Sequence, residues 1–147
     1  MNKSFTEDSL IELPAIEIFQ SLGYTHQNCF YETFGKDGTI GRETPSEVVL
    51  IPRLKRALQI LNPDLSNEAI ELAVEELTRD RSLLNPIVAN REIYKMLRDG
   101  VKVTLRQEDG SEETETVRVI DFNNPENNDF FLASQLWVTG EMYKRRA

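Results

Sequence analysis

Apolar residues recur every three or four positions through the first two thirds of the chain, and this period predicts helices. The first such segment covers roughly residues 7–22 and ends before Gly23, a residue type that commonly terminates helices. Pro14 lies inside this segment, where proline removes one backbone hydrogen bond. The pattern therefore predicts either a kinked helix or a true start nearer Leu10.

Residues 24–45 lack this period and contain three glycines, so we predict an extended piece followed by a loop. Three more amphipathic helices are expected beyond it. They are a helix over residues 46–61, bent or restarted at Pro52, a helix capped by Ser66, and a helix that opens at Asn85-Pro86 and stops at Gly100.

The apolar period changes to two after Gly100, which is typical of strands that expose one face. One alternating run begins there, and a second includes Val117 and Asp121, with a turn over residues 108–111 between them. The continuously apolar segment 130–139 predicts a buried third strand.

Together these patterns predict an α+β protein, with amino-terminal helices over residues 7–98, then an antiparallel β-hairpin and a further strand over residues 101–139. A length of 147 residues and a hydrophobic content of 39% suit one soluble domain with its own core, and we expect a single domain over residues 1–147. Neither an apolar run of the ~20 residues that a membrane helix requires nor a secretion signal is present. We therefore expect a cytoplasmic protein that contacts no membrane.

The formal net charge of −8 opposes binding to a polyanion unless basic residues cluster, so free-standing nucleic-acid binding is disfavoured. One cysteine, Cys29, and one histidine, His26, are too few for a zinc site, and we expect a buried thiol and a loop histidine. The chain has neither a phosphate-binding glycine loop nor a Gly-x-Ser-x-Gly nucleophile motif. None of the six lysines has an acidic residue two positions before it.

Several blocks spread over the chain are more specific than its composition. They are Glu12 with Phe19-Gln20-Ser21-Leu22-Gly23-Tyr24; Pro52-Arg53-Leu54; Leu61-Asn62-Pro63; Asn90-Arg91; Val119-Ile120-Asp121-Phe122-Asn123-Asn124-Pro125; Asn127-Asn128-Asp129-Phe130; and Ser134-Gln135-Leu136-Trp137-Val138-Thr139-Gly140. In these blocks, essentially the whole chain resembles the amino-terminal region of the R (restriction and motor) subunit of type I restriction enzymes.

The resemblance implies that the chain forms the first part of a nuclease domain of the PD-(D/E)XK type, in which metal-bound carboxylates activate water to cut DNA. In such a domain an Asp, and then a Glu-x-Lys, follow shortly after a pair like Arg145-Arg146. These residues would lie beyond Ala147. We therefore expect the 147 residues to be an incomplete nuclease domain that by itself cuts no DNA.

For the parent protein, the resemblance implies an ATP-dependent type I site-specific deoxyribonuclease. Such an enzyme cleaves unmodified foreign DNA with Mg²⁺ after ATP-dependent translocation. Mg²⁺ and ATP are its implied cofactors, and neither is expected to bind tightly to this chain alone. The modification and specificity subunits of the restriction complex are the implied partners, and DNA is reached through the parent.

Glu12 is the catalytic candidate within the chain. An acid from the first helix commonly completes metal sites of this nuclease type, and the resemblance gives that position, as a metal ligand, to Glu12. The alternative is an ordinary solvated helical glutamate. The basic residues Lys144, Arg145 and Arg146 are candidates for DNA contact, or equally a solvated chain end.

Two functional hypotheses remain open. The first is this nuclease module, and the second is a non-catalytic acidic domain that contacts another protein through residues 46–98. An Asp and a Glu-x-Lys in the sequence after Ala147 would decide for the nuclease. Under either hypothesis, Asp121 and Asp129 flank an Asn-Pro loop and are assigned turn and capping hydrogen bonds, and Trp137 is assigned to the core.

Overall fold

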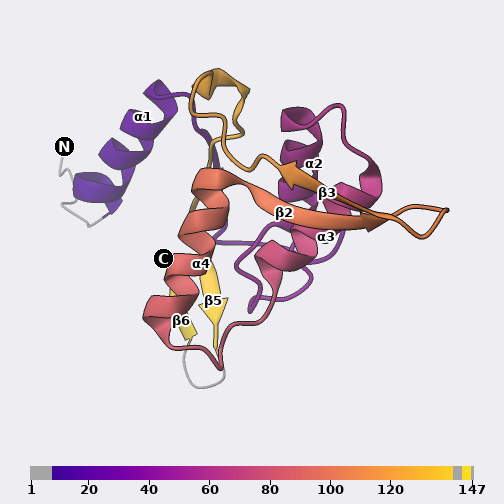
Figure 1. Cartoon of the computed structure of the whole chain (residues 1–147). Coiled ribbons are helices and arrows are strands. Elements are labelled where there is room, and N and C mark those ends of the chain that lie inside the picture. The colour runs from indigo at the N-terminus through magenta and orange to yellow at the C-terminus, as the bar shows by residue number, and fades with distance from the viewer. Residues whose placement is uncertain (1–7, 141–143, 147) are drawn as a thin grey trace, which may run out of the picture. The chain divides into compact units, whose positions relative to one another are not determined.

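The computed structural model describes residues 8–140 and 144–146, and the chain divides into two compact units. The first unit combines Met1–Val48 with Asp129–Ala147, and the second is the continuous stretch Val49–Asn128. Both contain helices and short two-stranded sheets (Figure 1), which confirms the α+β class. Whether the two units behave as one domain stays a prediction.

The first helical segment has two parts. η1, Asp8–Glu12, is a π-helix, and α1, Leu13–Ser21, continues it as an α-helix. Pro14 is the second residue of α1, so the change from π-helix to α-helix lies next to the proline, whose missing N–H removes one backbone hydrogen bond. Helix is already present at Asp8, so a start nearer Leu10 is wrong, and the irregularity expected at Pro14 takes the form of this change of helix type.

A parallel pair of strands joins the two segments of the first unit. β1, Thr25–Asn28, pairs along its whole length with β4, Phe131–Ser134. The ring of Tyr24 lies between those of Phe19 and Phe130, with centroids 5.0 and 5.1 Å away. This aromatic cluster connects the end of α1 to the sheet.

Residues 130–139 do not form one strand, so that prediction is wrong. β4 ends before Gln135, whose φ of +55° lies in the left-handed region, outside strand geometry. β5, Trp137–Thr139, then pairs antiparallel with β6, Lys144–Arg146, so the two strands have different partners. The residues of β4 and β5 are mostly half-buried, and the core assignment of Trp137 is wrong because this residue is 39% exposed.

Two helices of the second unit begin at their predicted caps. α3, Asn67–Thr78, follows Ser66, whose Oγ accepts a hydrogen bond from the N–H of Ala69 at 3.2 Å. α4, Pro86–Asp99, follows Asn85, whose Oδ1 accepts from the N–H of Ile87 at 2.9 Å. Among the helices that the structure describes, none combines the length and the apolar character needed to cross a membrane.

α2 covers Ile51–Leu61 rather than residues 46–61. Pro52 lies in its first turn, a position that suits proline and disfavours helix immediately upstream. The carbonyls of Pro45 and Glu47 instead accept hydrogen bonds from Arg42, at 3.2 and 2.8 Å. The predicted start at residue 46 is therefore wrong, whereas the restart expected at Pro52 agrees with the start of α2 at Ile51.

β2, Val101–Arg106, and β3, Glu112–Val117, form the predicted antiparallel hairpin. The alternating pattern predicted that the second strand would continue to Asp121, but β3 stops at Val117. The Asn62 side chain explains this end, because it donates to the carbonyl of Arg118 and accepts from its N–H, both at 2.8 Å. The backbone groups that a longer ladder would use are therefore occupied.

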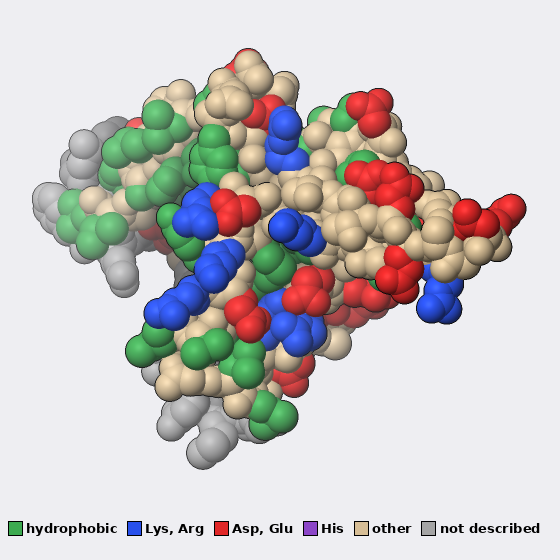
Figure 2. Space-filling model, in the orientation of Figure 1, with side chains coloured by type: hydrophobic (Ala, Val, Ile, Leu, Met, Phe, Trp, Pro, Cys, Tyr) green, Lys and Arg blue, Asp and Glu red, His purple; other side chains and the backbone are tan. Residues whose placement is uncertain are grey.

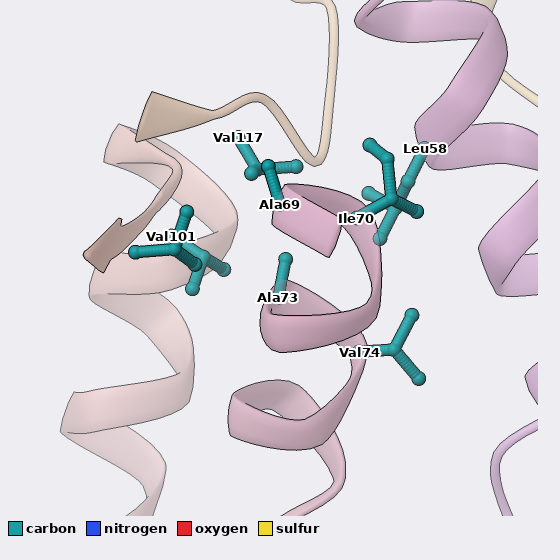
Figure 3. Packing of buried hydrophobic residues seen from close by; sticks show 8 residues of the cluster. Leu58, Ala69, Ile70, Ala73, Val74, Val101 and Val117 are labelled. Atoms are coloured by element: carbon teal, nitrogen blue, oxygen red, sulfur yellow. The ribbon is translucent and has the colours of Figure 1, made fainter. Parts of the chain in front are cut away.

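The core of the second unit lies on α3, between the β2–β3 hairpin and α2 (Figure 3). Ala69 and Ala73 are small enough to let α3 approach the hairpin closely. The buried members of this core are Leu58, Ala69, Ile70, Ala73, Val74, Val101, Val103 and Val117.

Shortening Ile70 removes buried methyl groups from the centre of this core. We expect Ile70→Ala to lower the free energy of unfolding of the second unit by about 2–5 kcal/mol, measured by chemical denaturation. Ile60→Ala is the matched control, because Ile60 is 63% exposed on α2 and its loss should cost at most about 0.5 kcal/mol. Equal losses in the two variants would contradict the core described here.

Candidate functional site

The carboxylate of Glu12 is held by a residue 123 positions away in the sequence. Gln135 Nε2 donates a hydrogen bond to Glu12 Oε2 at 2.5 Å, and both residues are half-buried. Glu12 is the last residue of the π-helix and stands immediately before α1. The sequence-predicted candidate is therefore fixed in direction by the tertiary structure, unlike a freely solvated glutamate.

Both partners of this contact lie on unusual backbone. π-helical turns are rare and often accompany functional sites. A non-glycine residue with positive φ, such as Gln135, costs on the order of 1 kcal/mol and persists only where the surroundings impose it. Two uncommon local conformations thus meet at one hydrogen bond.

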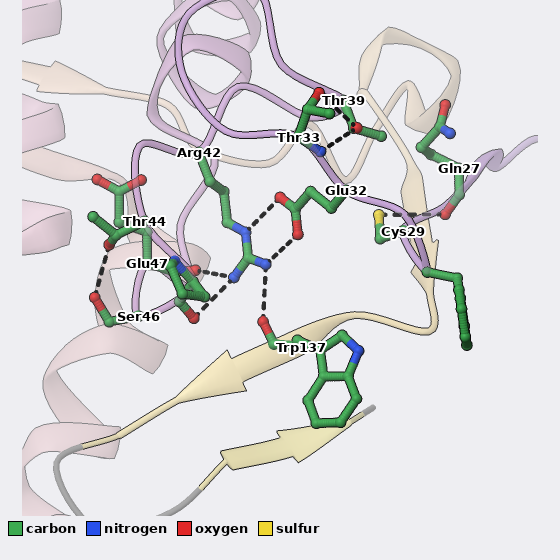
Figure 4. Close-up of polar contacts among 12 residues, drawn as sticks. Gln27, Cys29, Glu32, Thr33, Thr39, Arg42, Thr44, Ser46, Glu47 and Trp137 are labelled. Atoms are coloured by element: carbon green, nitrogen blue, oxygen red, sulfur yellow. Dashed lines mark hydrogen bonds and ion pairs between the residues drawn. The ribbon is translucent and has the colours of Figure 1, made fainter.

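A buried guanidinium anchors the strand that follows Gln135 (Figure 4). Arg42 is 1% exposed and forms a two-pronged ion pair with Glu32, with Nε 2.9 Å from Glu32 Oε1. Its Nη2 also donates to the carbonyl of Trp137 at 2.9 Å. Together with the bonds to the carbonyls of Pro45 and Glu47, these contacts join the loop after β1 to β5.

The electrostatics around Arg42 favour its charged form. The hydrogen bonds from Arg42 to the Glu32 carboxylate raise the pKa of the guanidinium above its ordinary value. Burial raises the pKa of the nearby Cys29 thiol, so this cysteine stays protonated and unreactive, as expected of a buried thiol.

The prediction of a loop histidine is wrong, because His26 lies in β1. Its Nε2 is 2.7 Å from Ser134 Oγ.

The antiparallel pairing of β5 and β6 brings the end of β6 close to the start of β5, near Gln135. Trp137 pairs with Arg146, and Thr139 pairs with Lys144, so β6 runs toward the start of β5. Arg146 therefore lies opposite a residue two positions from Gln135. The side chains of Lys144, Arg145 and Arg146 lie outside the described residues, and their DNA contact stays a prediction.

Metal ligands are sparse in the described part of the chain. Within residues 8–140 and 144–146 no group of three or more His, Cys, Asp and Glu residues could hold an ion. Glu12 therefore offers one carboxylate to a metal and needs other ligands to form a selective site.

Asp121 organises the Asn-Pro loop and has the predicted turn-forming role. Its Oδ1 accepts from the N–H groups of Asn123 and Asn124, and its Oδ2 accepts from Asn127 Nδ2, all at 3.1 Å. Asn128 closes the loop, with its Oδ1 accepting from Asp121 N–H at 2.8 Å. The hydrogen bond from Asn127 is the main reason that the pKa of Asp121 lies below its ordinary value.

An open pocket of about 540 Å³ lies in the second unit between α2, the end of α4 and this loop. Its arginines are paired locally, Arg98 with Asp99 and Arg118 with Asp121. The arginines of the pocket are therefore already engaged and are poorly placed to select an anionic ligand.

The sequence did not reveal the two residues that position Glu12 and β5. Arg42 lies in the irregular segment 24–45, where no periodic pattern distinguishes a buried charge from a solvated one. Gln135 had a weak signal, because it is the polar residue that interrupts the apolar run of residues 130–139. Neither partner was predictable, since both contacts join segments about a hundred residues apart.

Comparison with known proteins identifies the family. The model of the type I restriction enzyme R protein N terminus matches residues 4–147, and the chain belongs to this family. The chain is 34% identical over 133 residues to the type I restriction enzyme HindI endonuclease subunit of Haemophilus influenzae. It is 31% identical over 137 residues to the putative type I restriction enzyme MjaIXP endonuclease subunit of Methanocaldococcus jannaschii.

These alignments cover 87% and 90% of the chain but only 12% of each relative. The chain therefore corresponds to the amino-terminal region of the R subunit. No solved structure matches it.

Removing the Arg42 guanidinium should destabilise the first unit. We expect Arg42→Ala to cost about 3–5 kcal/mol, because it leaves the Glu32 carboxylate buried without its partner. Chemical denaturation followed by fluorescence of Trp137, the single tryptophan, measures this loss next to the network. Lys36→Ala, in the same loop but exposed, should stay within about 0.5 kcal/mol of wild type. Similar values for both variants would show that the network does not hold the loop.

The lowered pKa of Asp121 predicts a dependence of stability on pH. The charged carboxylate stabilises the loop fully above its ordinary pKa of about 3.9, and this stabilisation is lost as pH falls through the lower native value. The free energies of unfolding of wild type and Asp121→Asn should therefore differ most near neutral pH and converge in acid. Asp64→Asn, an exposed control in the same unit, should resemble wild type at both ends of the range. A difference for Asp121→Asn that is constant with pH would contradict the role of its charge.

Proposed function

We propose that the chain is the amino-terminal part of the nuclease module of a type I restriction R subunit. In this proposal the complete protein is an ATP-dependent deoxyribonuclease that cleaves unmodified foreign DNA with Mg²⁺ after ATP-driven translocation. The observation that carries the proposal is the family match over residues 4–147, joined to relatives named as endonuclease subunits.

Glu12 is the proposed metal-site carboxylate of this module. Its support is geometric, because Gln135 directs the carboxylate while occupying only Oε2 with its hydrogen bond. The β5–β6 register gives further support, since β6 approaches the Gln135 end of β5. In the proposal, the Asp that follows the Arg145-Arg146 pair in this nuclease type joins Glu12 at that end.

The roles of the chain's own residues follow from these positions. Glu12 binds the ion through an oxygen, and Gln135 orients the carboxylate and limits its rotation. Arg42 holds β5, and so the position of Gln135, through the Trp137 carbonyl. Mg²⁺, when bound by a complete ligand set, lowers the pKa of its water and offsets charge on the attacked phosphate.

The 147 residues alone should neither cleave DNA nor hydrolyse ATP. The sequence contains no acid-x-Lys pair and no phosphate-binding glycine loop. In the complete protein, the missing acid, the Glu-x-Lys and the ATP-driven motor come from the remainder of the chain.

The proposed setting is a cytoplasmic restriction complex. The modification and specificity subunits are the expected protein partners, and the specificity subunit supplies the recognition of the DNA sequence. Lys144, Arg145 and Arg146 are proposed to contact the phosphate backbone near the cleavage site.

Exchange of the Glu12 carboxylate for an amide tests the proposed site. In the complete protein with its partner subunits, we expect Glu12→Gln to reduce DNA cleavage by about 100-fold or more, because a charged metal ligand is lost. ATP hydrolysis and translocation should be unchanged, since the motor lies elsewhere. The measurements are plasmid cleavage and phosphate release under the same conditions.

Glu17→Gln is the matched control, because Glu17 is an exposed glutamate on α1. It should cleave DNA at the wild-type rate. Wild-type cleavage by Glu12→Gln would return Glu12 to the class of solvated helical glutamates.

A further inference from the structure

The outward face of α4, in the second unit, carries three basic residues in one stripe. Arg91, Lys95 and Arg98 are spaced four and then three residues apart, within about 60° of one another around the helix axis. All three are exposed. Figure 2 shows Lys and Arg side chains gathered over α4. We call these three residues, together with Tyr94, the α4 basic face.

The opposite side of α4 faces the unit, although none of the 14 residues of this helix is fully buried. Its half-buried apolar residues are Ala89, Ile93, Met96 and Leu97. Met96 packs against the core of the second unit. The helix is thus oriented by its inner side, and its basic side is presented outward.

The acidic residues of α4 neutralise only one of the three cations of this face, Arg98. Glu92 accepts hydrogen bonds from Arg81 Nε at 3.1 Å and from Arg79 Nη2 at 3.3 Å, so its charge is already used. Asp99 accepts from Arg98 through both oxygens at 2.6 Å. In the part of the chain that the structure describes, Arg91 and Lys95 have no carboxylate within ion-pair distance. Positive charge therefore remains at these two positions in a chain whose net charge is −8.

The face also carries an exposed aromatic ring. Tyr94 is 60% exposed, and the Arg98 guanidinium lies 5.6 Å from the centre of its ring. Arg91 and Lys95 are about 6 Å apart along the helix axis, which is about the axial rise of two nucleotides in one DNA strand. Two cations at this spacing beside a ring suit contact with phosphates and sugars of one strand.

The junction after α4 fixes the direction in which this face points. Gly100 has a φ of +87°, and a Cβ atom added to it would lie 2.8 Å from the carbonyl oxygen of Val117 and from Thr116 Cγ2. The helix therefore ends in close contact with β3.

The helix dipole explains only part of the stripe. Cations in the last turn of a helix stabilise it, and Arg98 lies there. Arg91 lies more than one turn earlier, where the dipole effect is small. The helix dipole therefore does not account for Arg91.

We propose that the α4 basic face binds the phosphate backbone of duplex DNA, independently of sequence. This proposal rests on the proposed function, which makes DNA the substrate, and it adds a contact surface outside the Glu12 site. Arg91 and Lys95 pair with phosphates, and Tyr94 packs against the sugar edge beside Arg98. An acidic protein surface is the competing occupant, and the experiment below distinguishes it.

The first measurement is the salt dependence of DNA binding by the complete protein. Arg91→Gln/Lys95→Gln should lower the slope of log K against log salt concentration by about 2, because two phosphate contacts are lost. Arg56→Gln/Arg106→Gln is the control, with the same charge change at two exposed positions of the same unit outside this face. Its slope should equal that of wild type, and circular dichroism should show both double variants folded.

The second measurement is reductive methylation of lysines, read by mass spectrometry, with and without a 30-base-pair duplex. Lys95 should be protected by DNA, whereas the exposed Lys36 should not. An unchanged slope, or a Lys95 that DNA leaves reactive, would overturn the proposal. Protection of Lys95 by the partner subunits without DNA would also overturn it, in favour of a protein interface. The Glu12→Gln result is independent of these outcomes, so the two proposals can fail separately.

Discussion

The buried guanidinium of Arg42 is the constraint on which the first unit depends. A charge at 1% exposure is stable only with matching acceptors, and here the Glu32 carboxylate and three backbone carbonyls provide them. Because one of these carbonyls belongs to Trp137, satisfying Arg42 also fixes the start of β5. The same bonds occupy Pro45 and Glu47, and they explain why α2 starts at Ile51 instead of residue 46.

The Glu12–Gln135 contact shows how a site residue gains meaning from its surroundings. On its own, Glu12 is one of several glutamates on an amphipathic helix. A π-helical turn and a left-handed residue, each of which costs free energy, bring its carboxylate to Gln135. That cost must be offset by the rest of the unit, and the Arg42 network next to β5 supplies such an anchor. The hydrogen bond from Gln135 therefore fixes the direction of the Glu12 carboxylate.

The net charge is a poor guide to the surface of the chain, because many acidic residues are paired with nearby arginines. The value of −8 argues against contact with a polyanion, yet Glu92 and Asp99 are engaged by arginines and leave Arg91 and Lys95 without counterions at close range. The α4 basic face is recognised only when the positions of these residues around the helix are combined with the ion pairs. In the pocket of the second unit, Arg98 is paired with Asp99 and Arg118 with Asp121.

The sequence by itself determined the elements whose signals are local. Ser66 and Asn85 cap their helices, the change of period after Gly100 gives the hairpin, and the motif blocks identify the family, because caps, turns and motifs act over a few residues. Only the tertiary structure decided where the run 130–139 breaks, which strands pair, and what holds Glu12. Those outcomes depend on contacts between segments about a hundred residues apart, and a linear pattern carries no record of the partner.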